Sequence, residues 1–343
     1  MGAVAIERNH APASRQTRVL EATLRRSWLP VARAWRMTPR GVRLLQQVTE
    51  PGRRVPMLGG TLVGRTHVAG CRAEWVRGPR AQRPQSAAPT DAAAILYLHG
   101  GGYVFGSPRT HRNLVSRISH VTGLPALSLD YRLPPVATLP APIEDALGAY
   151  RHLLDAGHAA SRIVVAGDSA GGNLALALAL HAAEQDLPRP AALILLSPWA
   201  DLTHSGASFT ANALLDPFLP PIALRRAART ALGGADAADW RIASPLFAPD
   251  ELWPQLPPTL IQVGSTEILH DDGVRVADRL TTAGVPAELH VFERQPHVPP
   301  LWTGTPAART ALLEIGRFVD THLPQAAAPP PPSPQDAATA AFS

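Results

Sequence analysis

Gly167-Asp168-Ser169-Ala170-Gly171 is the stretch of this 343-residue sequence that decides the fold. It follows the apolar run Ile163–Ala166 and precedes a long Ala/Leu-rich segment that begins at Gly172. A strand, a sharp turn that carries a serine, and a helix form the context in which Gly-x-Ser-x-Gly exposes the serine hydroxyl. The glycines are required there because a Cβ two residues to either side of a strained serine would collide with neighbouring chain. A small-residue turn without chemistry gives the same pattern, so the rest of the sequence has to decide.

Short continuous apolar runs alternate with longer segments of helical spacing on both sides of this stretch. Such alternation predicts an α/β fold with a mostly parallel central sheet that is flanked by helices on both faces. The expected strands are Ala94–Leu98, Ala126–Leu129, Ile163–Ala166, Ala192–Leu196, Thr259–Val263 and Ala287–Phe292, and the expected helices are 109–121, 142–155, 171–184, 271–284 and 306–322.

The segments outside this alternation have a different character. Residues 17–48 show helical spacing, which Pro30 and Pro39 are expected to break into short pieces. Residues 205–240 form a second helical insertion, which could lie above the strand ends beside the N-terminal helices. We expect little order between Gly78 and Thr90. The division of the chain is therefore an N-terminal helical segment (1–60), a core (61–204 and 241–323), the insertion (205–240) and a disordered Pro/Ala-rich tail (324–343).

The composition is that of a globular protein, with 45% hydrophobic and 17% charged residues. No apolar run approaches the ~18 residues of a membrane span, and Met1–Leu20 lacks the apolar centre of a secretory signal. The single cysteine, Cys71, excludes an intramolecular disulfide and reads as an ordinary small residue. We therefore expect a cytoplasmic location.

All 32 basic residues are arginine, which excludes Schiff-base chemistry and the lysine of a phosphate-binding loop. Residues 1–84 hold 16 arginines and 4 acidic residues, whereas the remainder holds 16 arginines and 23 acidic residues. A basic region of this kind could face nucleic acid or an anionic membrane surface. A solvated helical face is the preferred interpretation, because no nucleic-acid motif accompanies the charge, and no nucleic-acid partner is expected.

A glycine-rich turn, His99-Gly100-Gly101-Gly102, directly follows the expected strand Ala94–Leu98. Attack of a serine on an ester carbonyl generates an oxyanion, which backbone N–H groups aimed at it stabilise. We assign these donors to Gly101, Gly102 and Ala170, the residue after Ser169. A plain turn is the alternative, whereas a phosphate loop is excluded because the glycine spacing and lysine of such loops are missing.

A serine hydroxyl needs a base, and His297 is the best candidate. Where the Gly-x-Ser-x-Gly turn joins a strand to a helix of an α/β sheet, the acid and then the histidine follow the serine in the chain. His297 lies in a loop just past the expected strand Ala287–Phe292, at the edge of the sheet where active sites of open α/β sheets lie. The other candidates considered downstream of the serine are His181, His204, His270 and His290.

The acid is expected in the loop after strand Thr259–Val263. Glu267 lies closest to the end of that strand. Asp271 and Asp272 look like first-turn residues of the next helix, where carboxylates favour the helix dipole. Glu267 is therefore preferred, with Asp271 as the alternative.

Taken together, these motifs resemble those of the hormone-sensitive-lipase-like (bacterial family IV) esterases of the α/β-hydrolase superfamily, in the same order and over about residues 90–322. The matching landmarks are His99-Gly100-Gly101-Gly102, Asp130-Tyr131-Arg132-Leu133-Pro134, Gly167-Asp168-Ser169-Ala170-Gly171-Gly172-Asn173, Leu196-Ser197-Pro198-Trp199-Ala200-Asp201-Leu202, Ser244-Pro245-Leu246, Glu267 to Asp272 and Pro296-His297-Val298.

The resemblance implies a serine carboxylesterase that hydrolyses short- to medium-chain esters, small-molecule substrates, through an acyl-enzyme without a metal or cofactor. Ser169 would be the nucleophile, His297 the base and then the acid, and Glu267 the residue at the acid position, with oxyanion donors at Gly101, Gly102 and Ala170. It also implies a helical cap from residues 1–60 and 205–240. The chain departs from the family pattern at Glu267-Ile268-Leu269, where Asp-Pro-Leu is usual, and at Val136, where a glutamate is often found.

Two other functions remain open at the level of sequence. A lactonase would use the same residues on a cyclic ester, and a non-catalytic binding protein would keep the pocket but lose the reaction. The sequence does not set the oligomeric state, and a homodimer is one of the states it allows. Trp28, Trp35 and Phe218 could line a substrate pocket, but core packing is the preferred interpretation for each.

Overall fold

The apolar runs meet in one sheet of the computed structural model, which describes residues 5–9, 13–49, 56–82 and 92–323, the first range without its side chains. The order in this nine-stranded sheet is β1-β9-β8-β7-β6-β4-β5-β3-β2. Neighbours are parallel from β1 to β5 in this order, whereas β5–β3 and β3–β2 are antiparallel. The prediction of a mostly parallel sheet is confirmed. The strands are β1 (Ala5–Asn9), β2 (Leu62–Val68), β3 (Cys71–Arg77), β4 (Ala94–Leu98), β5 (Ala126–Asp130), β6 (Ile163–Asp168), β7 (Ala192–Leu196), β8 (Thr259–Gly264) and β9 (Ala287–Phe292).

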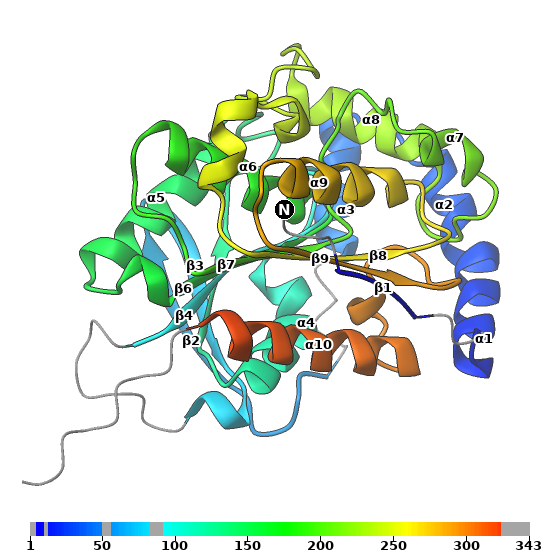
Figure 1. Ribbon diagram of the computed structural model, residues 1–343. Coiled ribbons are helices and arrows are strands. Elements are labelled where there is room, and N and C mark those ends of the chain that lie inside the picture. The colour runs from blue at the N-terminus through cyan, green and yellow to red at the C-terminus, as the bar shows by residue number, and fades with distance from the viewer. Residues whose placement is uncertain (1–4, 10–12, 50–55, 83–91, 324–343) are drawn as a thin grey trace, which may run out of the picture.

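Helices cover both faces of the sheet (Figure 1), and the alternation of side chains along each strand explains how. Leu96 and Leu98 of β4 belong to the buried cluster that also contains residues of α5, α6 and α9, whereas Ile95 and Tyr97 of the same strand belong to the cluster that contains residues of α4 and α10. A strand buried on both sides must be apolar throughout, which is why these strands read as continuous runs. These helices are α4 (Pro108–Thr122), α5 (Ala141–Asp155), α6 (Ala170–Glu184), α9 (His270–Thr282) and α10 (Pro306–His322).

The hairpin of β2 and β3 was not expected from the sequence. All but the last position of β2 are exposed or half-buried, and β3 carries the exposed Arg72 and Arg77, so no continuous apolar run marks these strands. Ala69 and Gly70 form the turn, both with positive φ (49° and 82°), the backbone of a two-residue hairpin turn. Asn-Gly is the usual signal for such a turn, and this chain lacks it.

The N-terminal helices depart from the expected break at Pro30. Helix α1 (Arg15–Thr23) continues through a π-helical turn (Leu24–Trp28) into α2 (Leu29–Ala34), with Pro30 in the first turn of α2. Proline has no N–H to donate, and the first turn of a helix needs none. The expected break at Pro39 is confirmed, because Pro39 begins α3 (Pro39–Thr49).

The 205–240 segment lies beside these helices (Figure 1). It contains α7 (Ser208–Ala211) and α8 (Pro221–Leu232). The indole Nε1 of Trp28 donates to the carbonyl oxygen of Phe218 at 2.9 Å, and Arg226 donates to that of Trp35 at 3.0 Å. Short 3₁₀ turns complete the described helices, at Pro79–Gln82, Ala160–Arg162, Pro245–Phe247, Asp250–Gln255 and Pro299–Leu301.

The first of these turns, Pro79–Gln82, lies in the stretch for which we expected little order, so that expectation is wrong for these four residues. The remainder of that stretch, residues 83–90, and the predicted Pro/Ala-rich tail, residues 324–343, lie outside the described residues.

Candidate active site

Ser169 occupies the sharp turn between β6 and α6, with φ 55° and ψ −120°. A Cβ on Gly167 would lie 2.1 Å from the carbonyl oxygen of Gly171, and one on Gly171 would lie 2.0 Å from that of Leu98. The expectation that glycine is required on both sides of the serine is confirmed. The serine backbone is also fixed, because its N–H donates to the carbonyl oxygen of Leu196 at 2.8 Å.

The glycine-rich turn follows β4, the neighbour of β6 in the sheet. Gly101 and Gly102 have φ of 120° and 60°, and a Cβ on Gly101 would lie 2.1 Å from the carbonyl oxygen of Phe105. Both glycines line the same pocket as Ser169. Ala170, the third expected donor, is the first residue of α6 and is fully buried. Gly101 and Gly102 thus share a pocket with Ser169, and Ala170 directly follows the serine in the chain.

Buried polar contacts hold the glycine-rich turn in place. The Asp168 carboxylate accepts the N–H of Gly100 at 3.1 Å and the hydroxyl of Tyr97 at 2.6 Å. It also pairs with Nε2 of His111 at 3.4 Å. Burial alone would raise the pKa of the Asp168 carboxyl, but the charge and hydrogen bond of His111 bring it below its ordinary value. The same pairing outweighs burial for His111 and raises the pKa of its imidazole.

His99 lies on the other side of this turn as a neutral ring. Burial lowers the pKa of its imidazole to about 3. The ring stacks on Tyr131 at 4.2 Å between centroids, and the Tyr131 hydroxyl donates to the carbonyl oxygen of His99 at 2.6 Å. Sequence reasoning did not identify Tyr97, His111 or Tyr131 as parts of the site. Tyr97 lies inside an apolar run and His111 inside a helix, so neither carries a signal of its own.

His297 and Glu267 come together in the described structure. Nδ1 of His297 lies 2.9 Å from Oε2 of Glu267, and both side chains are buried. The histidine loop is fixed by two contacts, from the Trp302 indole to the carbonyl oxygen of His297 and from the N–H of Val298 to Ser197 Oγ, each at 2.9 Å. His297 Nε2 is buried, has no hydrogen-bond partner among the described residues, and belongs to a side chain that lines the pocket of Ser169.

Asp271, the alternative acid, lies elsewhere. Its Oδ2 accepts the N–H of Ser208 at 2.8 Å. Asp272 is also turned away, because its Oδ2 accepts the N–H of Asp201 at 3.0 Å. Glu267 is thus the carboxylate of this loop that the described structure pairs with His297.

The other candidate histidines make unrelated contacts. His290 of β9 pairs with Glu288 of the same strand and with Glu314 of α10, and His181 stacks on Trp240. His204 lies between the rings of Trp199 and Phe209. None of these three, nor His270, lines the pocket of Ser169.

This pocket has a volume of about 260 Å³ and is lined mainly by apolar side chains. Trp28 and Trp35 from the N-terminal helices and Phe218 from the 205–240 segment form part of its wall. The alternative interpretation, that these residues line a substrate pocket, therefore holds for all three, and Trp35 also packs against the hydrophobic core. The three residues come from the N-terminal helices and the 205–240 segment, which are far apart in sequence, and no periodic pattern predicts that these segments are in contact. Phe218 stacks on Trp28 at 5.5 Å and on the His297 ring at 6.1 Å.

Among the described residues, no cluster of three or more His, Cys, Asp or Glu side chains is arranged to bind a metal ion. The Cys71 thiol is buried, and burial together with Asp145 raises its pKa to about 11, which keeps the thiol protonated. In the described part of the chain, no helix combines the length and apolar character that crossing a membrane requires.

Comparison with known proteins places this geometry in a family. A family model described as an α/β-hydrolase fold matches residues 95–300. The structure of an esterase from the bacterial hormone-sensitive lipase family superposes with a TM-score of 0.79 at 36% identity, over 91% of this chain and 100% of that one. The chain belongs to the hormone-sensitive-lipase-like α/β-hydrolases.

Other relatives of this hydrolase are named for ester hydrolysis. An acetyl-hydrolase of Streptomyces hygroscopicus is 41% identical over 74% of this chain and 81% of that protein. The carboxylesterase/phospholipase LipF of Mycobacterium tuberculosis is 35% identical over 76% of this chain and 69% of that protein. An esterase/lipase structure from an uncultured bacterium is 37% identical, with a TM-score of 0.81 over 91% of this chain and 99% of that one. The hydrolase is a carboxylic ester hydrolase.

Proposed function

We propose that this hydrolase is a serine carboxylesterase in which Ser169 is the nucleophile, His297 the general base and acid, and Glu267 the carboxylate that orients His297. The observation that carries the proposal is the state of His297. Its Nδ1 is paired with Glu267, and its buried Nε2 has no partner in the described structure and belongs to the pocket that Ser169 shares. A histidine held in this way has one nitrogen left to exchange a proton with a serine hydroxyl.

The proposed reaction has two halves. Ser169 Oγ attacks the ester carbonyl carbon while its proton passes to His297 Nε2, and the negative charge moves to the carbonyl oxygen. His297 then gives that proton to the leaving alkoxide as the C–O bond breaks, which leaves the acyl group on Ser169. A water molecule, deprotonated by His297, attacks the acyl carbon, and Ser169 leaves with the proton that His297 returns. The carboxylic acid is the second product.

The N–H groups of Gly101, Gly102 and Ala170 are the proposed donors to the oxyanion in both halves. Each such donor is worth roughly 2.7–4 kcal/mol in the transition state. Because the turn that carries the two glycines is held by Asp168 and Tyr131, the donors are aimed before substrate binds. Donors that are already oriented require no reorganisation energy during the reaction.

The pocket supports short- to medium-chain acyl groups. Its volume of about 260 Å³ and its apolar wall favour an alkyl chain over a charged or extended polar group. The substrate class proposed here is therefore a small carboxylic ester with an acyl chain of this size.

Replacement of the nucleophile tests the proposal. We expect Ser169→Ala to lower kcat for p-nitrophenyl butyrate by about 10⁴-fold or more while the protein remains folded by circular dichroism. Ser128→Ala is the matched control, because Ser128 is a buried serine in β5 whose hydroxyl has no partner in the described structure. A fluorophosphonate probe should label the wild type and the control but not Ser169→Ala. Retained turnover in Ser169→Ala, or a folded wild type that the probe does not label, would refute Ser169 as the nucleophile.

A further inference from the structure

The loop that carries Glu267 is bonded directly to the start of the 205–240 segment. The carbonyl oxygen of Glu267 accepts the side-chain amide of Asn212 at 2.9 Å. The same amide also donates to the carbonyl oxygen of Ser265 at 3.2 Å. The Asn212 side chain, at the carboxyl end of α7, therefore binds the carbonyl oxygens of two loop residues that are two positions apart.

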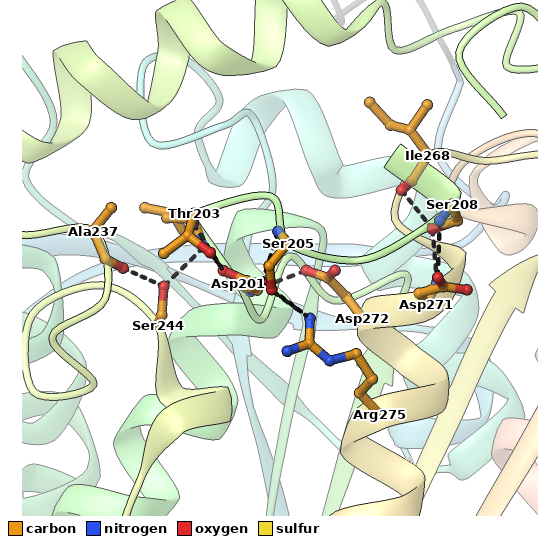
Figure 2. Close-up of polar contacts among 11 residues, drawn as sticks. Asp201, Thr203, Ser205, Ser208, Ala237, Ser244, Ile268, Asp271, Asp272 and Arg275 are labelled. Carbon is orange, nitrogen blue, oxygen red and sulfur yellow. Dashed lines mark hydrogen bonds and ion pairs between the residues drawn. The ribbon is translucent and has the colours of Figure 1, made fainter. Parts of the chain in front are cut away.

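The backbone of the next residue, Ile268, is held by two further side chains of that segment. The N–H of Ile268 donates to Oδ2 of Asp216 at 3.0 Å, and the carbonyl oxygen of Ile268 accepts the hydroxyl of Ser208 at 2.8 Å. Figure 2 shows Ser208 between Ile268 and Asp271. The Ser208 hydroxyl also accepts the N–H of Asp271 at 3.0 Å. Ser208, Asn212 and Asp216 together bind the backbone on the carboxyl side of Glu267, and we call these three residues the loop clamp.

The clamp also reaches the aromatic wall of the pocket. Asp216 is 1% exposed, and its Oδ1 accepts the N–H groups of Phe218 and Leu219 at 2.8 and 2.9 Å. The Phe218 ring lies nearly parallel to the His297 ring, at 17°. One buried carboxylate thus joins the Glu267 loop to a side chain that packs on His297.

The clamp is anchored at its amino-terminal side. The N–H of Asp201 donates to Asp272 at 3.0 Å, and Arg275 donates to Asp201 at 2.9 Å and to Ser205 at 3.1 Å. Figure 2 shows these contacts between the chain that enters the segment and helix α9. The chain just before Ser208 is therefore bonded to α9.

The Glu267 carboxylate has little support of its own. Oε2 meets His297, whereas Oε1 is buried without a hydrogen-bond partner in the described structure. A glutamate has one more rotatable bond than an aspartate, so a single hydrogen bond leaves more conformational freedom to be removed. The conformational freedom of the Glu267 side chain must therefore be limited by a firmly held backbone at this residue.

We propose that Ser208, Asn212 and Asp216 are positioning residues that hold the Glu267 loop so that its carboxylate meets His297. The proposal rests on the proposed role of Glu267. It assigns to the 205–240 segment a part in arranging the reacting groups, in addition to forming the pocket wall. Loss of the Asn212 or Ser208 contacts should therefore lower kcat and leave substrate binding nearly unchanged.

A kinetic double-mutant cycle tests this assignment. We expect Asn212→Ala to lower kcat for p-nitrophenyl acetate about tenfold, which corresponds to about 1.4 kcal/mol, with KM within about twofold, because the variant removes both hydrogen bonds from this side chain to the loop. In a Glu267→Gln background, Asn212→Ala should cause no further loss, because residues that act through one another are not additive. Thr210→Ala, at an exposed position of the same helix, is the control and should behave as the wild type.

A second pair of variants covers the case in which Asn212→Ala fails to fold. Ser208→Ala removes the hydroxyl that bonds Ile268, whereas Ser208→Thr retains a hydroxyl, so the first should lower kcat and the second should restore most of it. Equal losses from Asn212→Ala in both backgrounds, or a rise in KM alone, would overturn the clamp. If Glu267→Gln itself retains full activity, the proposed role of Glu267 fails instead; a collapse in Glu267→Gln with additive losses refutes the clamp alone.

Discussion

His297 Nδ1 and Glu267 Oε2 lie 2.9 Å apart in a part of the structure from which solvent is almost fully excluded. The two residues follow different strands, β9 and β8, which are parallel neighbours in the sheet. The carboxyl ends of parallel strands meet at the same edge, so residues 30 positions apart in sequence are brought into contact. The glutamate has a longer side chain than the aspartate usual in the family, and in this chain it still reaches the imidazole.

The first prediction concerns this pair. Glu267→Gln should lower kcat for p-nitrophenyl butyrate by about 10³- to 10⁴-fold, because the imidazole loses the carboxylate that orients it. Asp271→Asn should retain most of the activity, since Asp271 bonds the N–H of Ser208 and not His297. Steady-state kinetics of both purified variants provide the measurement. A near-normal rate for Glu267→Gln together with a collapsed rate for Asp271→Asn would reverse the assignment of the acid.

The second prediction concerns the turn at Ser169. A Cβ on Gly171 would lie 2.0 Å from the carbonyl oxygen of Leu98 and 2.6 Å from that of His99, both of them backbone atoms. We expect Gly171→Ala to lower the free energy of unfolding by about 3 kcal/mol or more, because packed backbone cannot move aside. Gly64→Ala is the control, since a Cβ there meets no atom within 4 Å, and its effect should stay within about 0.5 kcal/mol. Urea unfolding gives both values, and equal stabilities would contradict the steric argument.

The elements that sequence predicted well are those buried on both faces. Strands such as Ala94–Leu98 read as unbroken apolar runs because helices cover each side of the sheet. The β2–β3 hairpin was missed because its exposed positions break the apolar pattern. At Pro30 the local rule for proline failed, because a preceding π-helical turn places that residue where no N–H is required.

The same contrast holds for the candidate site. Ser169, His297 and Glu267 could be named because each follows a strand, and strand ends define one edge of the sheet. The residues that hold these three in place could not be predicted from the sequence. Asn212 reaches the carbonyl oxygen of Glu267 across 55 positions, and Trp28 meets Phe218 across 190. Contacts of this kind depend on how the 205–240 segment packs, which no local pattern encodes.

The third prediction concerns His204, whose ring lies between Trp199 and Phe209. Burial lowers the pKa of this imidazole from 6.5 to about 4. Between these pH values the unfolded chain binds a proton at His204 that the folded protein does not, so the folded state loses stability as the pH falls. His204→Asn removes this contribution, and asparagine tolerates the positive φ of 61° at that position.

Urea unfolding of the wild type and His204→Asn between pH 7 and 4 checks this prediction. The free energy of unfolding of the wild type, measured relative to that of the variant, should decrease as the pH falls from 6.5 to 4. Other titrating groups contribute to both proteins and cancel in the difference. A difference that is constant over this range would show that His204 titrates normally in the folded protein.

The fourth prediction concerns the length of the acyl chain that the pocket accepts. Trp35 lines the pocket at the end of α2, and removal of its indole enlarges the space beside the proposed acyl site. We expect Trp35→Ala to raise the ratio of kcat/KM for p-nitrophenyl octanoate over that for the butyrate by about tenfold or more. The added methylenes then gain apolar contact, and each buried methylene is worth about 0.8 kcal/mol.

Trp75→Ala is the matched control for this change. It removes the same indole from a half-buried position in β3 that does not line the pocket. If both variants change the ratio equally, the effect arises from loss of stability and not from pocket size. A ratio that is unchanged in Trp35→Ala would place the acyl chain along another part of the wall, and the same pair of esters measured on Leu219→Ala would then locate it, because Leu219 lines the pocket from the 205–240 segment.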